Sequence, residues 1–260
     1  MSTAPVHGAV VPGYPRYVRI MGRPINSYKL LLCVGIYFGA LATAALASSS
    51  GYSPLRFGLA GMACALSGIL GARLYFLIVN ASHFASRRSL AGLWDGREGG
   101  LGVFGGLIPL ILTALAAAKW LGISASGLLD HLAFGILIGG FWIRLGCVFN
   151  GCCGGRETHG PLCVQLHDTE GVIKPRIPVQ FLEMASWLLG AAGFLMLWPG
   201  LLPDGSYMLA VMAWYGSVRF VLEPLRELPD IVFGRVRINQ LIAAALAITS
   251  GAALIFRGWA

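Results

Sequence analysis

Seven long apolar stretches dominate this sequence and restrict its choice of fold class. An α-helix needs about 20 mostly apolar residues to cross the hydrocarbon core of a bilayer. Stretches of this kind lie at residues 30–48, 57–80, 101–121, 131–149, 178–198, 206–223 and 238–257. Only 12% of the residues are charged, against roughly 25% in a typical soluble domain. The sequence therefore predicts an all-α integral membrane protein with about seven transmembrane helices.

Helical length and abundant glycine favour a helix bundle over a β-barrel. The chain has 36 glycines, which allow close helix packing in membranes, and it lacks the alternating segments of about ten residues that barrel strands need. We expect one polytopic domain over residues 1–260, with an extramembrane segment at 1–29 and an extramembrane loop at 150–177. No cleavable signal peptide is evident, so the first span is expected to direct insertion.

Basic residues are concentrated on one side of the predicted bundle. If the spans alternate in direction, thirteen of the 19 Lys and Arg residues lie on the side of the N-terminus, here called side A, and three lie on the opposite side B. The positive-inside rule alone would place side A in the cytoplasm. A net charge of +8 in a membrane protein indicates contact with anionic lipid headgroups, and no nucleic-acid-binding motif is present.

Three arginines fall inside predicted spans, where an ionised side chain is costly and commonly functional. Arg73, Arg144 and Arg219 each lie in the side-A half of their helix. The spans that run in the opposite direction begin with further polar residues at this depth: Tyr28, Gln180, Glu183 and Gln240. We therefore expect the helices to surround a cavity that opens to one leaflet, on side A. A structural ion pair is the alternative for single residues, since Arg219 and Glu223 are four apart on one helical face.

The arginines indicate the chemistry that such a cavity would suit. A guanidinium group stays protonated and offers a planar fork of donors that matches phosphate oxygens. Several arginines without enough acids to neutralise them favour a site for an anionic, phosphate-bearing lipid, where they would stabilise phosphate as a leaving group. The side-B halves of the spans are almost wholly apolar, and we interpret His131 there as an interfacial residue.

Short motifs occur in order along these spans. Residues 144–155 read RLGCVFNGCCGG, residues 71–80 read GARLYFLIVN, and the fifth and sixth spans contain PVQFLE and RFVLEPLR. Over most of the chain, the sequence resembles the phosphatidylglycerol-prolipoprotein diacylglyceryl transferase family. The positions that match its motifs are Tyr28, residues 71–80, Arg144, Gly146, Asn150, Gly151, Pro178, Gln180, Glu183, Arg219, Phe220, Glu223, Arg226 and Gln240.

The resemblance implies an enzyme that transfers the diacylglyceryl group of phosphatidylglycerol to the lipobox cysteine thiol of a prolipoprotein signal peptide. The products would be a thioether and glycerol phosphate, and no metal or cofactor would be needed. The candidate catalytic residues are Tyr28, Arg144, Arg219 and Glu223. The residues expected to bind substrate are Arg73, Gly105, Gly106, Gly146, Asn150, Gly151, Gln180, Glu183, Arg226 and Gln240. The site would face the outer leaflet of the bacterial inner membrane, contrary to the positive-inside count.

One departure from the family pattern concerns the base that would activate the incoming thiol. The family's His-Gly-Gly-Leu-Ile segment reads FGGLI here, so Phe104 occupies the place of a histidine that is often assigned as this base. A phenylalanine cannot accept a proton. The other candidates are Tyr28, His159, His167, Glu183 and Glu223. Alternatively, the thiol ionises beside the arginines without a dedicated base.

The second departure is a group of cysteines at the end of the fourth span. Cys147, Cys152 and Cys153 lie close together in sequence, and Cys163 follows. The alternatives are a structural disulfide, for which Cys163 and one of the others are the favoured pair, or inert packing; a catalytic or redox thiol; and a metal ligand. The sequence lacks the paired-ligand spacing of a zinc site, so we predict no metal.

Three other functions compete with this transferase activity. A paralogue would use the same lipid with a different acceptor. A membrane transporter for an anionic solute would show polar residues on both sides and an inverted repeat, and we find neither. A membrane thiol-disulfide oxidoreductase would show a Cys-x-x-Cys pair, whereas this chain has the adjacent pair Cys152 and Cys153.

Overall fold

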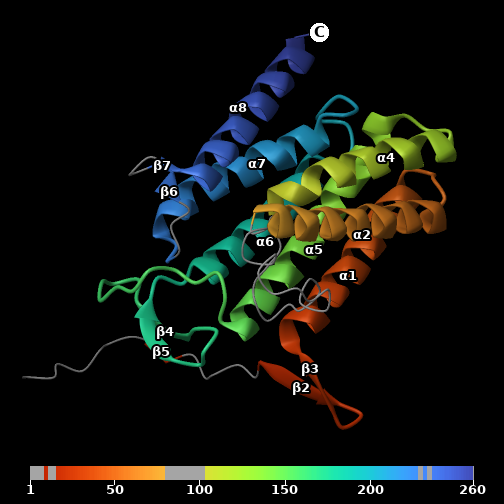
Figure 1. Ribbon diagram of the computed structural model, residues 1–260. Coiled ribbons are helices and arrows are strands. Elements are labelled where there is room, and N and C mark those ends of the chain that lie inside the picture. Colours follow the sequence, from red (N-terminus) through yellow and green to blue (C-terminus); the bar gives the residue numbers. More distant parts are fainter. Residues whose placement is uncertain (1–8, 11–15, 80–102, 228–230, 233–235, 260) are drawn as a thin grey trace, which may run out of the picture.

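A computed structural model describes residues 9–10, 16–79, 103–227, 231–232 and 236–259 (Figure 1). These ranges contain the α-helices α1 (Ser27–Ser49), α2 (Pro54–Val79), α4 (Leu107–Leu121), α5 (Ala125–Asn150), α6 (Val179–Leu197), α7 (Tyr207–Leu222) and α8 (Ile238–Trp259). Each helix corresponds to one of the seven predicted spans. The all-α fold class is therefore confirmed.

Five of these helices are long and apolar enough to cross a membrane, namely α1, α2, α5, α6 and α8. The helices α4 and α7 have only 15 and 16 residues. Each is continued by a short 3-10 helix, which rises more steeply per residue than an α-helix. These are η3 (Val103–Gly106) before α4 and η4 (Glu223–Leu225) after α7. The chain is a multi-pass membrane protein whose two shorter helices gain length from these turns.

Helix α5 lies inside the bundle, where it contacts α1, α2, α4, α6 and α7 (Figure 1). Its closest partner is α1, because glycines let the two backbones touch. A Cβ atom added at Gly39 would lie 2.8 Å from the carbonyl oxygen of Gly135, and one added at Gly35 would lie 2.9 Å from that of Gly139. Small residues at a crossing are a common means of tight helix packing in membranes. By contrast, α8 packs on α7 at the edge of the bundle.

Short strands lie in three groups at side A, of which the first two are in the lower part of Figure 1 and the third is at its left. The antiparallel hairpin of β2 (Tyr17–Ile20) and β3 (Arg23–Asn26) leads directly into α1. Between α5 and α6, β4 (Val164–His167) pairs antiparallel with β5 (Ile173–Arg176) and parallel with β1 (Ala9–Val10). A third pair, β6 (Ile231–Val232) and β7 (Val236–Arg237), precedes α8. The sequence patterns do not predict these strands.

At the opposite end of α5, His131 and Asp130 are buried within the protein, with 3% and 2% of their surface exposed. The His131 ring packs against Tyr52, Phe57 and Trp198 at centroid distances of 5.5, 4.9 and 5.1 Å. The prediction that His131 is an interfacial residue is therefore wrong. Asp130 instead accepts hydrogen bonds from backbone N–H groups at the start of α7.

Candidate active site

Three arginines converge on two glutamates at the side-A ends of α5, α6 and α7. Glu183 Oε2 lies 2.9 Å from Arg144 Nε, and Glu183 Oε1 accepts hydrogen bonds from Arg219 Nη1 at 2.8 Å and Arg226 Nη1 at 3.2 Å. Arg219 Nη2 also lies 2.9 Å from Glu223 Oε2. We call these five residues the arginine–glutamate cluster. Four of them are at least nine-tenths buried: Arg144, Glu183, Arg219 and Glu223.

Helix ends position these charges. Glu183 follows shortly after the start of α6 at Val179, and Arg219 lies in the last turn of α7. A carboxylate near the N-terminus of a helix and a cation near the C-terminus are both stabilised by the helix dipole. The ion pair of Arg219 and Glu223 forms between neighbouring turns of one helical face, as their spacing predicts.

The cluster contains more positive than negative charge. Its three guanidinium groups meet only two carboxylates, so one positive charge is left over. Arg219 Nε is buried and has no hydrogen-bond partner among the described residues. An additional guanidinium group approaches from β7, where Arg237 Nη1 donates to the backbone carbonyl oxygen of Glu223. The cluster therefore has both the charge and the donors to accept an anion.

The start of α1 and the end of α5 are joined next to this cluster. The side chain of Asn26 caps α1 by accepting from the Tyr28 N–H at 2.9 Å, and its Nδ2 donates to Asn150 Oδ1 at 3.3 Å. Gly146 leaves room for the tyrosine, because a Cβ atom there would lie 3.2 Å from Tyr28 Cδ2. Gly151 caps α5 with a left-handed φ of 68°, a conformation that favours glycine. These contacts hold the start of α1, which carries Tyr28, against the end of α5, which carries Asn150.

Three thiols meet at this capped end of α5. The sulfur atoms of Cys147, Cys152 and Cys153 all lie within 4.8 Å of one another. After Gly151 the chain turns back, and the Cys152 N–H donates to the carbonyl oxygen of Cys147 at 3.2 Å. Arg144 Nη1 lies 3.9 Å from Cys147 Sγ, so the thiol cluster adjoins the arginine–glutamate cluster.

The disulfide to Cys163, one of the alternatives for these cysteines, does not form in this structure. All six cysteines are free, and the described thiol cluster does not include Cys163. The sequence placed Cys147, Cys152 and Cys153 close together along the chain, but it did not predict that their sulfur atoms converge.

Gln180 ties α6 to the turn that carries the thiols. Its Nε2 donates to the carbonyl oxygen of Cys152 at 3.1 Å. Its Oε1 is buried and has no hydrogen-bond partner in the described part of the chain. Beside it, a backbone bridge between Gly155 and Arg226 holds the end of η4 against the same loop. The thiols, Gln180 and Arg226 are thus connected through the backbone.

Comparison with known proteins identifies the family. Residues 15–256 match the model of the family described as prolipoprotein diacylglyceryl transferase. The chain belongs to this family. It is 28% identical over 270 residues to a protein from Corynebacterium diphtheriae named phosphatidylglycerol--prolipoprotein diacylglyceryl transferase, with 96% of this chain and 95% of the relative covered. A protein of the same name from Streptococcus pyogenes is 29% identical over 192 residues, which are 69% of this chain and 70% of the relative. The resemblance seen in the motifs is therefore confirmed, and the chain is a member of a transferase family.

Two predicted binding residues of this family member lie outside the ion pairs of the cluster. Arg73 on α2 is 9% exposed and stacks over the ring of Phe76 at 5.3 Å. Gln240 on α8 donates from Nε2 to the backbone carbonyl oxygen of Phe220 on α7 at 3.3 Å. Substrate contact by either residue stays a prediction. Asn80, at the end of the matched segment 71–80, lies outside the described residues.

The predicted binding residues Gly105 and Gly106 lie in η3, where they allow this turn to pack on α2. A Cβ atom at Gly106 would lie 2.5 Å from the carbonyl oxygen of Gly68, and one at Gly105 would overlap the side chain of Tyr75. Phe104 is in the same 3-10 turn. Packing alone explains these glycines, and their contact with substrate stays a prediction.

The candidate bases occupy different environments. Both glutamates form ion pairs with arginines, which favour their ionised form, but Glu183 Oε2 and Glu223 Oε2 are buried and accept no hydrogen bond among the described residues. His159 is exposed, and His167 Nε2 lies 3.4 Å from the carbonyl oxygen of Phe149, close to the end of α5. Tyr28 lies next to the thiol cluster. Neither His159 nor His167 hydrogen-bonds to the arginine–glutamate cluster in the described part of the chain.

Sequence reasoning missed two residues that complete this region. Asn26 joins α1 to α5, and Arg237 adds a donor to Glu223. The position of Asn26 directly before the first apolar run is a typical N-cap signal, so this role was open to prediction. The Arg237 contact depends on the fold of the segment between α7 and α8, for which the sequence offers no pattern.

An apolar groove runs between α6 and α7 beside the arginine–glutamate cluster. It has a volume of about 340 Å³ and is lined by Leu182, Trp214, Ser217, Val218, Val221 and Leu222. Leu182, Val218 and Leu222 are the chain neighbours of Glu183, Arg219 and Glu223. The groove is lined by two helices and by none of the arginines or glutamates, so the predicted cavity surrounded by the helices stays a prediction.

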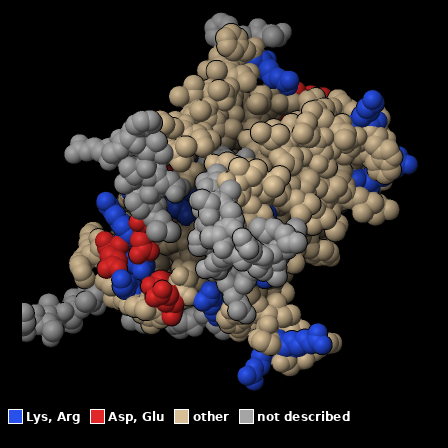
Figure 2. Space-filling model, viewed as in Figure 1, with Lys and Arg blue, Asp and Glu red and all other residues tan. Residues whose placement is uncertain are grey.

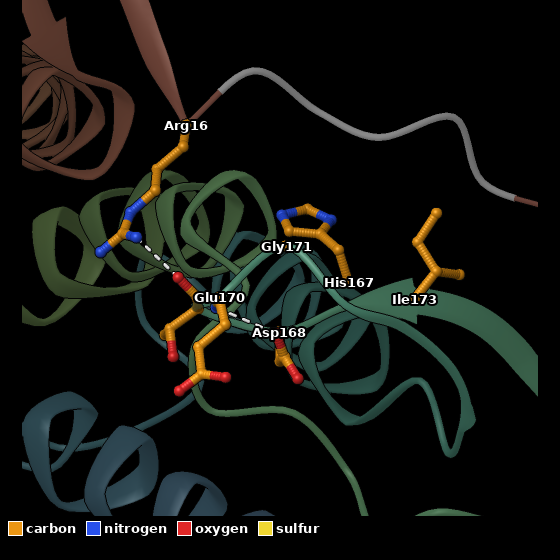
Figure 3. Close-up of a pocket in the computed structure, with 7 residues that line it drawn as sticks. Arg16, His167, Asp168, Glu170, Gly171 and Ile173 are labelled. Atoms are coloured by element: carbon orange, nitrogen blue, oxygen red, sulfur yellow. Dashed lines mark hydrogen bonds between the residues drawn. The ribbon is translucent and has the colours of Figure 1, made fainter.

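A second pocket lies outside the bundle, at the turn between β4 and β5 (Figure 3). It has a volume of about 250 Å³ and is lined by Arg16, His167, Asp168, Thr169, Glu170, Gly171 and Ile173. Arg16 reaches across to donate from Nη1 to the carbonyl oxygen of Thr169 at 2.6 Å. The pocket lies mainly where the N-terminal segment that carries Arg16 contacts this turn.

Local acids neutralise some of the side-A basic residues. Figure 2 shows acidic and basic side chains interleaved around the β4–β5 region. Arg176 pairs with Asp168 at 3.5 Å and also with Glu227. Partial burial of Asp168 opposes its ionisation, but hydrogen bonds from two backbone N–H groups and the nearby Arg176 outweigh this effect and lower the pKa of its carboxyl. The unbalanced charge of side A therefore lies at the buried cluster rather than in this hairpin.

Proposed function

We propose that this protein transfers the diacylglyceryl group of phosphatidylglycerol to the thiol of a lipobox cysteine in prolipoproteins, releasing glycerol phosphate. The observation that carries the proposal is the arginine–glutamate cluster, in which three guanidinium groups, two of them from buried residues, meet two buried carboxylates. A phosphodiester supplies one negative charge and two accessible oxygens for such donors. Family membership supports the same reaction.

The surroundings of the cluster suit the parts of this lipid. Arg219 Nε, which is buried without a partner among the described residues, would donate to the phosphate. Gln180 Oε1, the buried acceptor, would receive a hydroxyl hydrogen from the glycerol headgroup. The apolar groove between α6 and α7 would hold part of an acyl chain. Headgroup and tail would thus occupy neighbouring polar and apolar surfaces.

The charge change in the reaction explains why arginine would assist it. The thiolate attacks the glycerol carbon of the diacylglyceryl group, a C–S bond forms, and the C–O bond to phosphate breaks. The bonding electrons leave with the phosphate oxygen, so a phosphodiester with one negative charge becomes a phosphomonoester with two. Guanidinium groups stabilise this growing charge more strongly than the starting charge, which lowers the barrier. Arg144 and Arg219 would serve this purpose, and Glu183 would position both.

Both substrates would enter from the bilayer. The acceptor is the signal peptide of a prolipoprotein, and we place the site toward the outer leaflet of the bacterial inner membrane. The basic residues of side A would then attract anionic lipid to the entrance.

The test is turnover by the purified full-length protein in phosphatidylglycerol vesicles with a lipobox peptide, followed by mass spectrometry of the peptide. The wild-type protein should yield the diacylglyceryl thioether. Arg144→Lys and Arg219→Lys should each reduce turnover by about 100-fold or more, because lysine keeps the charge but loses the planar donor fork. Arg257→Lys is the matched control and should retain turnover. Arg257 lies at the C-terminal end of α8, where it donates to the carbonyl oxygen of Asp204 and contacts none of the described residues of the cluster.

Different failures have different meanings. Release of glycerol phosphate without peptide modification would overturn the prolipoprotein acceptor and favour a paralogue that uses the same lipid. Undiminished turnover in folded Arg144→Lys and Arg219→Lys would refute the role of the arginines. No release of glycerol phosphate in any condition would overturn the proposed reaction.

A further inference from the structure

The proposed reaction leaves the thiol cluster without a role. Cys147 is 3% exposed, while Cys152 and Cys153 are partly exposed, so the cluster has a buried side and an open side. A disulfide would use only two of these sulfur atoms, and a bond between the adjacent Cys152 and Cys153 is strained. Coordination of one metal ion by all three sulfur atoms explains their convergence better than a disulfide does.

The spacing of the sulfur atoms suits a thiophilic cation. Zinc binds thiolates at a Zn–S distance of about 2.3 Å, which in a tetrahedral site separates the sulfur atoms by about 3.8 Å. The three sulfur atoms already lie within 4.8 Å of one another, so rotation of the side chains is sufficient to reach that separation.

The backbone holds the thiols in this arrangement at a cost. Cys153 has a φ of 61°, in the left-handed region that a residue with a side chain rarely adopts. This conformation costs roughly 1–2 kcal/mol relative to the right-handed region. Together with the left-handed Gly151, it folds the chain back onto the last turn of α5, where Cys147 lies. The strained φ of Cys153 is therefore part of the backbone conformation that brings the three thiols together.

The surrounding charge favours thiolates. Arg144 Nη1 lies 3.9 Å from Cys147 Sγ, and a neighbouring cation stabilises a thiolate relative to the thiol. Three thiolates and one divalent cation carry a net charge of −1. The arginine–glutamate cluster has one positive charge in excess and Arg237 adds another next to Glu223, so one positive charge remains for a phosphate.

We infer that Cys147, Cys152 and Cys153 bind one Zn²⁺ ion as three thiolates and leave its fourth position open on the exposed side of the cluster. Zinc sites with three protein ligands and an open position are typically catalytic. The metal site itself does not depend on the proposed function. The role of the fourth position does rest on it, because the acceptor in that reaction is a thiol.

The open position on zinc would explain how the acceptor thiol loses its proton although Phe104 replaces the family's histidine. When a thiol binds zinc it is deprotonated, and the proton passes to water. The coordinated thiolate then attacks the glycerol carbon, the C–S bond forms, and the electrons of the breaking C–O bond leave with glycerol phosphate. The zinc stays divalent throughout, and the thioether product, which is a weaker ligand than a thiolate, dissociates. No histidine base is required.

Metal content tests the site without lipid or peptide. The full-length protein is purified in detergent with a phosphine reductant, incubated with Zn²⁺, equilibrated against a competing chelator and analysed by mass spectrometry of the elements. We expect one Zn²⁺ per chain in the wild-type protein and in Cys163→Ser, the matched control outside the cluster. We expect Cys147→Ser and Cys153→Ser to lose the bound metal. Cys152→Ser, at a partly exposed position, serves as a third variant if the buried Cys147→Ser protein does not fold.

Spectroscopy of the cobalt form tests the open position. With Co²⁺ in place of Zn²⁺, thiolate coordination should give sulfur-to-cobalt charge-transfer absorption. Addition of N-acetylcysteine should then shift the ligand-field bands of the wild-type protein as a fourth thiolate binds. Removal of Zn²⁺ by chelation should abolish peptide modification, and Zn²⁺ should restore it.

Three outcomes would overturn the inference. These are a wild-type protein that retains no Zn²⁺, a Cys153→Ser protein that retains as much as Cys163→Ser, and an unreduced protein in which thiol counting shows two of the three cysteines joined as a disulfide. If Zn²⁺ is retained but its removal leaves peptide modification unchanged, the role of the fourth position is wrong. If Zn²⁺ is retained and no thioether ever forms, the metal site stands and the proposed function fails.

Discussion

The two ends of α5 each bury charged residues, but they satisfy the charge in different ways. At side B, Asp130 accepts hydrogen bonds from the backbone N–H groups of Gly205 and Met208, the latter at 3.0 Å, and fixes the start of α7. Aromatic rings enclose the neighbouring His131. At side A, the arginine–glutamate cluster keeps one positive charge in excess and a buried donor without a partner among the described residues.

This difference distinguishes a buried charge that only stabilises the fold from buried charges that belong to a candidate active site. A buried ionised group is costly in either place, so burial alone does not indicate function. Asp130 finds its partners in the backbone of its own protein and has a structural explanation. The side-A cluster has one guanidinium group more than it has carboxylates, and it adjoins a set of thiols. The unbalanced charge is what makes side A the candidate active site.

The largest expected effect comes from Glu183→Gln. Because three arginines share this carboxylate, its loss should leave buried guanidinium charge unpaired and lower the free energy of unfolding by about 3–5 kcal/mol. Transfer activity should also be lost. Unfolding in detergent and turnover in vesicles measure the two effects. Glu157→Gln is the control, because Glu157 forms an exposed pair with Lys174. A Glu183→Gln protein as stable as this control would show that the carboxylate is not the shared centre of the cluster.

Asp130→Asn should separate stability from activity. The amide retains one acceptor oxygen for the two backbone donors, so the free energy of unfolding should fall by about 1–3 kcal/mol. The folded variant should turn over at the wild-type rate, since Asp130 lies at the other end of α5. Thermal unfolding and the vesicle assay check this expectation. Loss of turnover in a folded Asp130→Asn protein would remove the distinction between the two ends of the helix.

The smallest effect concerns the hairpin of β4 and β5, where the charge of Asp168 is paired and partly exposed. Its lowered pKa means that its contribution to stability is present above the unfolded-state pKa of about 4 and is lost as the pH falls through the folded-state value. Asp168→Asn should therefore be slightly less stable than wild type at pH 7, and the difference should vanish in acid. Melting temperatures at both pH values measure it. A difference that persists at low pH would show that geometry, and not charge, explains the effect.

The sequence was informative where structure depends on local pattern. Apolar length alone located all seven helices, and the depth of Arg144 and Arg219 predicted that they would lie together. Prediction from the sequence failed where the structure depends on contacts between distant segments or on unusual backbone angles. The pairing of Arg226 with Glu183 depends on how η4 continues α7, and the thiol cluster depends on the φ of Cys153. His131 was misjudged because a span boundary does not reveal which aromatic residues will cover it.

The glycine contact between α1 and α5 has a consequence for how the chain is made. During synthesis α1 enters the membrane first, while its closest partner is the segment Ala125–Asn150, which follows much later. A nascent chain that ends before α5 has exposed glycine surfaces on α1 and no backbone to fill them. Although α2 contacts α1, the packing of α1 is completed only when α5, the fourth of the seven spans, has been inserted.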